Sequence, residues 1–111
     1  MERPIYEYSA EKNLKLLEER GIGFEDIIAV LNAKGPLEVI DHPNKIKYPF
    51  QKIYIMDIDG YAYLVPFERH GNKAILKTIF PSRKITRIYR NKLLRGKQPW
   101  AEKNEMSLVF S

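Results

Sequence analysis

The sequence predicts a single α+β domain in which a small antiparallel sheet, a β-meander, follows two helices and precedes a third. Two segments with helical spacing of apolar residues open the chain, and four β-rich segments joined by short turns come next. A length of 111 residues is typical of one domain, and 44% hydrophobic residues can fill one core. We therefore treat 1–111 as a single domain, with a core over about 8–95, a C-terminal tail at 96–111 and the helices on one face of the sheet.

The two N-terminal helices are expected at about 10–20 and 24–33. Ser9 is placed to cap the first helix, and Gly21 suits the position just after its end. The second helix carries acidic residues in its first turn, where they favour the helix dipole, and it should end before Gly35. Its apolar residues follow the i, i+3, i+4, i+7 spacing of a buried helix face, at Phe24, Ile27, Ile28 and Leu31.

The four strands are expected at 37–40, 51–58, 61–68 and 73–80. Asp59-Gly60 joins the second and third of them, and a two-residue Asp-Gly link between β-rich segments is a strong hairpin signal. A second short turn at 70–72 then returns the chain, so the last three strands should form an antiparallel meander. Pro66 lies inside the third strand, where it indicates a bulge or an unpaired backbone position because proline has no N–H.

The last helix is expected at about 83–95, with Ser82 as its cap. Its apolar side consists of Ile85, Ile88, Tyr89 and Leu93. Its other side carries three arginines at i, i+4 and i+7, namely Arg83, Arg87 and Arg90.

Charge is distributed very unevenly along the chain. Residues 1–68 contain 8 Lys/Arg and 12 Asp/Glu, a net charge of −4, whereas residues 69–98 contain 10 Lys/Arg and no acid, a net charge of +10. A surface this one-sided favours a polyanion as partner. The alternative is a solvated basic helix that binds nothing.

Several site classes receive no support from the sequence. There is no cysteine, which excludes disulfides, thiol catalysis and cysteine-bound zinc. His42 and His70 lie 28 residues apart without metal-ligand spacing, and a loop hydrogen bond is the favoured role for His42 over a metal site with Asp41. We expect no cofactor. No apolar run approaches the ~18 residues of a membrane span, no signal peptide is seen, and we expect a cytoplasmic protein that does not bind membranes.

The residues that could carry chemistry lie on the last two strands and the start of the last helix. They are Glu68, Arg69, His70, Lys77, Ser82, Arg83, Lys84, Arg87 and Arg90. The period of two places Lys77 on the same strand face as Ile75 and Ile79, so its side chain either extends along an edge or reaches a functional surface. Cations at the start of a helix oppose its dipole, which favours a functional reason for them. We expect these cations to converge on one pocket that fits a phosphodiester.

Such a set can cleave RNA without a metal. Glu68 or a deprotonated Lys77 could remove the proton from a ribose 2′-OH, and His70 or Lys77 could protonate the leaving 5′-oxygen. Arginine and lysine would stabilise the charge of the transition state. Tyr48 or Tyr89 could stack on a base if exposed, and packing in the core or its rim is the alternative for each.

The sequence also resembles the BrnT-type toxins of bacterial toxin–antitoxin pairs, which are distant relatives of the RelE ribonucleases. The resemblance covers about residues 8–92. It is carried by the segments SAEKN (9–13), RGIGFED (20–26), KYPFQK (47–52) and LKTIFPSRK (76–84), in that order. The sequence departs from the pattern of this family in two places. The turn after Arg69 is longer, and Phe80-Pro81 lengthens the junction between the last strand and the last helix.

The resemblance implies a RelE-like fold, endoribonuclease activity as the toxin of a type II toxin–antitoxin system, and neutralisation by an antitoxin that binds DNA. By position, the catalytic role falls to Glu68, Arg69, Lys77, Ser82 and Arg83. RNA binding falls to His70, Lys84, Arg87 and Arg90. Two alternatives remain: a basic nucleic-acid-binding protein without catalysis, and a domain that only binds a protein partner.

Overall fold

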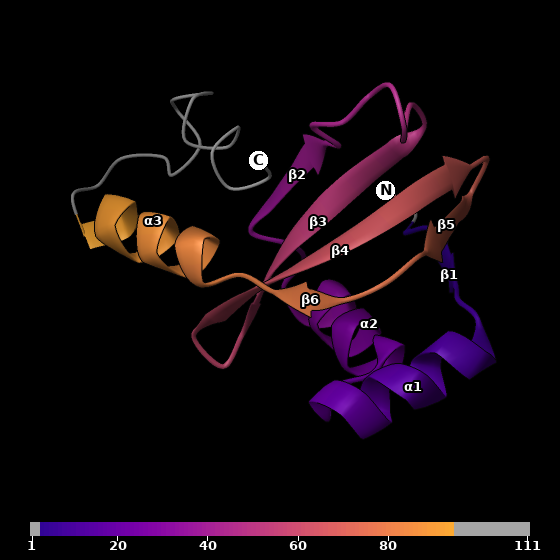
Figure 1. Ribbon diagram of the computed structural model, residues 1–111, viewed down its shortest axis with the longest axis horizontal. Coiled ribbons are helices and arrows are strands. Elements are labelled where there is room, and N and C mark those ends of the chain that lie inside the picture. Colours follow the sequence, from indigo (N-terminus) through magenta and orange to yellow (C-terminus); the bar gives the residue numbers. More distant parts are fainter. Residues whose placement is uncertain (1–2, 95–111) are drawn as a thin grey trace.

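The computed structural model describes residues 3–94, with side chains up to residue 90. These residues form a sheet of six strands and three helices (Figure 1). In chain order the elements are β1 (Ile5–Glu7), α1 (Ala10–Arg20), α2 (Phe24–Ala33), β2 (Glu38–Asp41), β3 (Gln51–Ile58), β4 (Tyr61–His70), β5 (Lys73–Leu76), β6 (Phe80–Pro81) and α3 (Arg83–Leu94). The predicted α+β class is confirmed. The predicted tail at 96–111, Arg95 and the side chain of Leu93 lie outside the described residues. In the described range, no helix is long and apolar enough to cross a membrane.

The sheet is a meander with two additions. Strands β3, β4 and β5 pair antiparallel with their chain neighbours, as predicted, and β2 pairs antiparallel with β3. At one edge β1 pairs parallel to β5, with Ile5 opposite Lys73, and β6 pairs with the start of β4. Strand β1 was not predicted, because a strand of three residues is too short to show an alternating pattern.

Capping interactions define both ends of α1 and the start of α2. The hydroxyl of Ser9 accepts the N–H of Lys12 and caps α1 as predicted, and Gly21 ends the helix with φ at +70°. The side chain of Asn13 on α1 accepts the N–H of Phe24 at 2.7 Å, so it caps the next helix in place of a local side chain. A Cβ at Gly23 would lie 2.7 Å from that Asn13 oxygen, which explains why a glycine is needed at this crossing.

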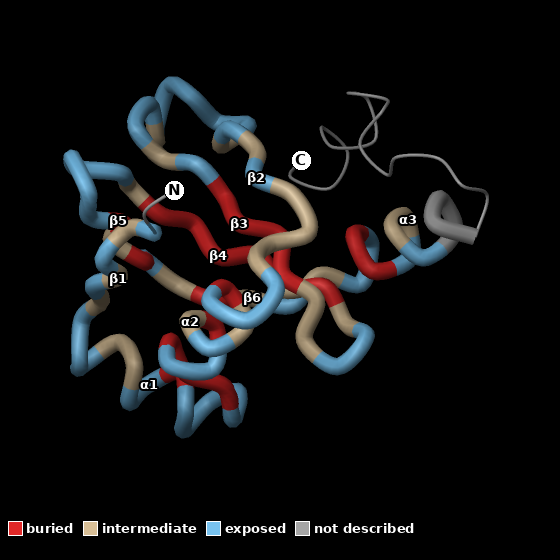
Figure 2. Tube along the Cα trace, turned by 180° about the vertical axis from the view of Figure 1, so that it is seen from behind, coloured by how far each residue is buried: buried red, intermediate tan, exposed pale blue. Residues whose placement is uncertain are grey.

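Helices α1 and α2 cover one face of the sheet. The core on this face contains Leu16, Ile22, Phe24, Ile27 and Leu31 from the helical part, and Tyr54, Met56, Val65, Phe67, Ala74, Leu76 and Ile79 from the sheet and the segment after β5. Figure 2 shows buried residues along β3 and β4 and on the inner side of these helices. Each large apolar side chain buried here contributes about 1.5–3 kcal/mol, so this face holds most of the hydrophobic stabilisation.

Helix α3 lies on the opposite face, which corrects the expectation that all helices share one face. Its buried Ile85 packs with Ile53, Ile55, Ala62 and Leu64, the side chains that alternate with those facing α1 and α2. Only the start of α3 is held this way, and Figure 1 shows the helix extending away from the end of the sheet. Among the residues that the structure describes, no helix covers the rest of this sheet face.

Pro66 lies in the regular ladder of β4, opposite Ile53, and forms no bulge there. Its effect appears in the neighbouring segment. The carbonyl of Pro66 accepts the N–H of Lys77, but Pro66 has no N–H to donate in return. The predicted strand 73–80 accordingly divides into β5 and β6. Ile79 consequently packs in the α1–α2 core, rather than on the face of Lys77 as expected.

Candidate functional site

One carboxylate and two basic side chains meet on the uncovered face of the sheet. Nε2 of His70 lies 3.0 Å from Oε1 of Glu68, and Nζ of Lys77 lies 3.8 Å from Oε2 of the same residue. Gln51, opposite Glu68 on β3, also hydrogen-bonds to this carboxylate. Solvent reaches all three titratable side chains, since the exposed fractions are 25% for the Glu68 side chain, 38% for Lys77 and 58% for His70. We call Gln51, Glu68, His70 and Lys77 the carboxylate cluster.

These contacts keep Glu68 ionised. The hydrogen bond from His70 is the largest cause of a lowered pKa for the Glu68 carboxyl, and Lys77 and Gln51 lower it further, against an opposing effect of partial burial. An ionised carboxylate that solvent can reach is able to accept a proton.

Strand register brings the cluster together. The Asp59-Gly60 hairpin pairs Ile58 with Tyr61, and counting back along both strands places Gln51 opposite Glu68. The next turn places Glu68 opposite Ile75. Lys77 follows Ile75 by two residues and so reaches Glu68 diagonally. Lys77 therefore lies on the same sheet face as Glu68, and its ammonium group is 3.8 Å from that carboxylate. Gln51 was missed, although the hairpin signal alone was enough to pair it with Glu68.

Arg69 lies on the other face of the sheet. It pairs with Ala74, which is part of the α1–α2 core, and its Nε donates to the carbonyl of Gly71 at 3.0 Å. Neighbouring strand residues point to opposite faces, so Arg69 cannot share a site with Glu68. The structure does not bring Arg69 to the cluster, although the sequence reasoning grouped these two residues.

The start of α3 lies at the far end of β4 from the cluster. Ser82 donates its N–H to Ala62 at 2.9 Å, whereas Lys77 pairs with Pro66. Ala62 and Pro66 are four residues apart on β4, which corresponds to ~13 Å along the strand. The Ser82 hydroxyl accepts the N–H of Ile85 at 3.1 Å, so its predicted role as a helix cap is confirmed.

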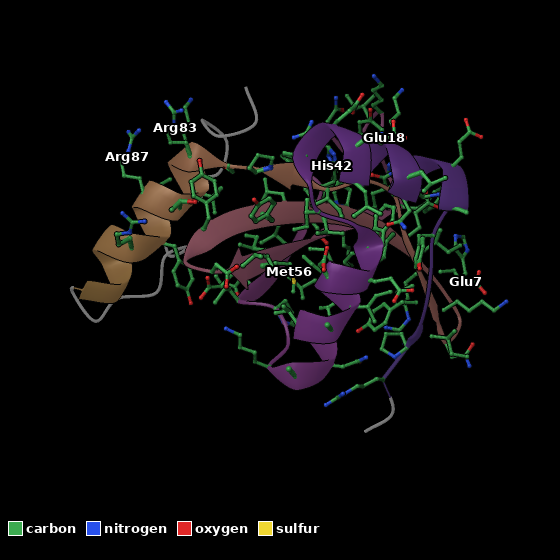
Figure 3. All side chains as sticks on the ribbon, turned by 90° about the horizontal axis from the view of Figure 1, so that it is seen from below. Glu7, Glu18, His42, Met56, Arg83 and Arg87 are labelled. Atoms are coloured by element: carbon green, nitrogen blue, oxygen red, sulfur yellow. The ribbon has the colours of Figure 1, made fainter. Side chains whose placement is uncertain are left out.

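The arginines of α3 do not converge with Lys77. Arg83, Arg87 and Arg90 are exposed, as is Lys84. Figure 3 shows Arg83 and Arg87 projecting from one side of α3, away from the sheet. The expectation of one pocket shared by the cations of the last strand and the last helix is therefore wrong: the described residues form two separate groups.

The loop before β3 supplies an aromatic pair beside the sheet. His42 and Tyr48 have ring centroids 4.5 Å apart, and the N–H of His42 donates to the Gln51 carbonyl at 3.1 Å. Burial lowers the pKa of His42, and its Nδ1 accepts the N–H of Asn44, so the predicted loop hydrogen bond is confirmed. Tyr48 is half-buried against His42.

A pocket of about 220 Å³ lies between α3 and the β3–β4 hairpin. This pocket could not be predicted from the sequence, because its walls come from segments whose contact depends on where α3 docks. It is lined by Leu37, Asp57, Gly60, Tyr61, Ala62, Thr86, Tyr89 and Arg90. Arg90 is the one residue of the predicted site that borders it.

The fold and the cluster define an α+β protein with an ionised carboxylate held between an imidazole and an ammonium group on an open sheet face. Comparisons with protein families, with curated proteins and with solved structures find no match for this chain. Its function must therefore be argued from the residues themselves.

Proposed function

We propose that this protein is a metal-independent endoribonuclease that acts in the cytoplasm as the toxin of a type II toxin–antitoxin pair, with a RelE-like fold. RNA is its substrate, and a cognate antitoxin is its protein partner. The observation that supports the cleavage step is the position of Glu68 between His70 and Lys77, at 3.0 Å and 3.8 Å. The toxin role rests on the sequence resemblance.

The proposed reaction needs only these side chains. Glu68 accepts the proton of the ribose 2′-OH, and the 2′-oxygen attacks the adjacent phosphorus. Protonated His70 donates its proton to the leaving 5′-oxygen as the P–O5′ bond breaks. Lys77 stabilises the negative charge of the pentacovalent transition state. The products are a 2′,3′-cyclic phosphate and a 5′-hydroxyl, and one proton has moved from the 2′-OH to Glu68 and another from His70 to the leaving oxygen.

The arginines of α3 have a separate role in this proposal. Arg83 and Arg87 project on one side of the helix, where they can contact phosphates of the same RNA strand at a distance from the bond that is cut. This division replaces the single pocket expected from the sequence.

The test is cleavage of a single-stranded RNA in the presence of a metal chelator. We expect 5′-hydroxyl and 2′,3′-cyclic phosphate ends, and Glu68→Gln should slow single-turnover cleavage by about 100-fold or more, the usual scale for a lost general base. Glu7→Gln is the matched control, since Glu7 pairs with Lys73 at 3.3 Å on the same sheet face but does not contact the cluster. Equal rates for wild type and Glu68→Gln, or products with 5′-phosphates, would refute the proposal.

A second candidate is a basic nucleic-acid-binding protein without catalysis. The observation that favours it is the separation of the α3 arginines from the acid–base groups, because such a helix can bind a polyanion without the cluster. Salt-dependent RNA binding with no cleavage in any buffer would establish this candidate and exclude the first.

A further inference from the structure

The pocket beside α3 has the features of a site for a flat, hydrogen-bonding ring. Its volume of about 220 Å³ is below the ~300–1,000 Å³ of sites for drug-sized ligands, so it fits a single ring system. Tyr61 from the hairpin and Tyr89 from α3 supply aromatic surface, and Arg90 supplies a planar cation at the rim. Aromatic rings and guanidinium planes are the surfaces on which proteins stack unpaired bases.

Hydrogen bonds join the two elements that form the walls of this pocket. The Thr86 hydroxyl accepts the N–H of Ala62 at 2.8 Å and donates to the carbonyl of Ser82 at 2.7 Å, which joins α3 to β4. On the hairpin side, Oδ1 of Asp57 accepts the N–H of Gly60 at 2.8 Å. Asp57 is thereby oriented by the turn that follows it, and a carboxylate can accept about four hydrogen bonds in all.

The hydrogen-bonding character of the Asp57 carboxylate distinguishes among the four RNA bases. An ionised carboxylate accepts hydrogen bonds and donates none, so it selects a ring edge with neighbouring donors. Guanine presents N1–H and the exocyclic N2 amino group side by side. Adenine and cytosine present an amino group next to an unprotonated ring nitrogen, and uracil places its one N–H between two carbonyls, which a carboxylate repels.

We propose that this pocket is a guanine-binding subsite for single-stranded RNA, in which Asp57 accepts from the Watson–Crick edge and Tyr61, Tyr89 and Arg90 contact the ring. This rests on the proposed function in that RNA is the ligand. Ala62 borders the pocket, and Glu68 lies six residues further along β4, or ~20 Å. The base that is bound therefore belongs to a nucleotide some distance from the bond that is cut, and the subsite selects where along an RNA the protein binds.

The test uses guanosine and adenosine 3′-monophosphate as probes, titrated into the full-length protein; neither probe contains a phosphodiester bond that the protein could cleave. The backbone amide of Gly60 reports on Asp57 in nuclear magnetic resonance spectra, because it donates to that carboxylate. We expect the guanosine probe to shift the Gly60 signal and to bind about tenfold or more tightly than the adenosine probe, the scale of one bidentate base contact.

The variant is Asp57→Asn, whose side-chain oxygen can still accept from Gly60, so the turn is preserved. It should abolish the preference for guanosine. Asp59→Asn is the matched control: it removes the same charge in the same turn, its residue does not line the pocket, and asparagine tolerates its φ of +53°. Equal affinity for the two probes, or a preference that survives Asp57→Asn, would overturn the subsite. Guanosine selectivity in a protein that never cleaves RNA would leave the subsite standing and refute only the nuclease.

Discussion

At the scale of single residues, the environment of Glu68 is what separates a candidate base from an ordinary surface carboxylate. In the ion pairs of two other described surface carboxylates the partners are lysines: Lys73 for Glu7, and both Lys45 and Lys52 for Asp41. Glu68 contacts both His70 and Lys77, and its pKa is lowered chiefly by the hydrogen bond from His70. Because the folded protein holds this pKa below its unfolded value, the stabilisation is present above the unfolded pKa and is lost as pH falls through the folded one.

The direction of this shift can be tested without any activity assay. His70→Ala removes the donor that favours ionised Glu68, so the pKa of the Glu68 carboxyl should rise. The measurement is a pH titration of the Glu68 side-chain carbon signal in both proteins. Arg69→Ala is the control, since Arg69 lies on the opposite face, and it should leave the Glu68 titration where it is. An unchanged titration in His70→Ala would show that the imidazole does not set the state of Glu68.

At the scale of elements, α3 depends on few contacts for its position. Ile85 packs against the sheet, and Thr86 is the one polar residue among those described that is buried, at 8% exposed. Its hydroxyl satisfies the N–H of Ala62 and the carbonyl of Ser82. The placement of the basic helix and of the neighbouring pocket therefore depends strongly on one hydroxyl group.

Thr86→Val should lower the free energy of unfolding by about 1–3 kcal/mol, because it leaves the buried N–H of Ala62 without an acceptor. Urea denaturation measures this loss through the transition midpoint. Thr86→Ser retains the hydroxyl and should recover most of the stability. If Val and Ser are equally stable, the hydrogen bond does not hold α3 to the sheet.

The basic side of α3 should control the salt dependence of RNA binding. Replacing Arg83 and Arg87 by glutamine removes two phosphate contacts, so the slope of log K against log salt for single-stranded RNA should become less steep by about 1.4. The matched control is replacement of Lys12 and Lys15 on α1, which packs on the other side of the sheet. A slope that responds equally to both pairs would mean that binding follows net charge rather than α3.

Helices and hairpins were the predictable elements. Both N-terminal helices and β3 have the predicted bounds, because caps, apolar spacing and the Asp59-Gly60 turn are all local signals. The short β1 and the division of 73–80 into β5 and β6 were not predicted. Each depends on a partner strand: β1 forms only against β5, and the break after β5 follows from the missing N–H of Pro66 on β4.

At the scale of the whole molecule, the two faces of the sheet differ in what they carry: one packs against α1 and α2, and the other carries the carboxylate cluster. Helices α1 and α2 bury one face, and on the other face α3 covers one end and leaves the carboxylate cluster exposed at the far end. Successive side chains along β4 point to opposite faces of the sheet. Glu68 and His70 therefore share one face, whereas Arg69, which the sequence placed in the same group, lies on the other. The position of α3 depends on long-range docking, so the separation of Arg83 and Arg87 from Lys77 could not be predicted from their closeness in sequence.

The central claim is that cleavage and RNA binding belong to separate groups of residues. The most direct test measures the dissociation constant and the single-turnover rate at saturating RNA for two variants. Glu68→Gln should slow the saturated rate by about 100-fold with its affinity for RNA nearly unchanged. Joint replacement of Arg83 and Arg87 by glutamine should weaken binding and leave the saturated rate within about threefold of wild type. If both variants lose the saturated rate to the same degree, the arginines and Glu68 act at one site and the account is wrong.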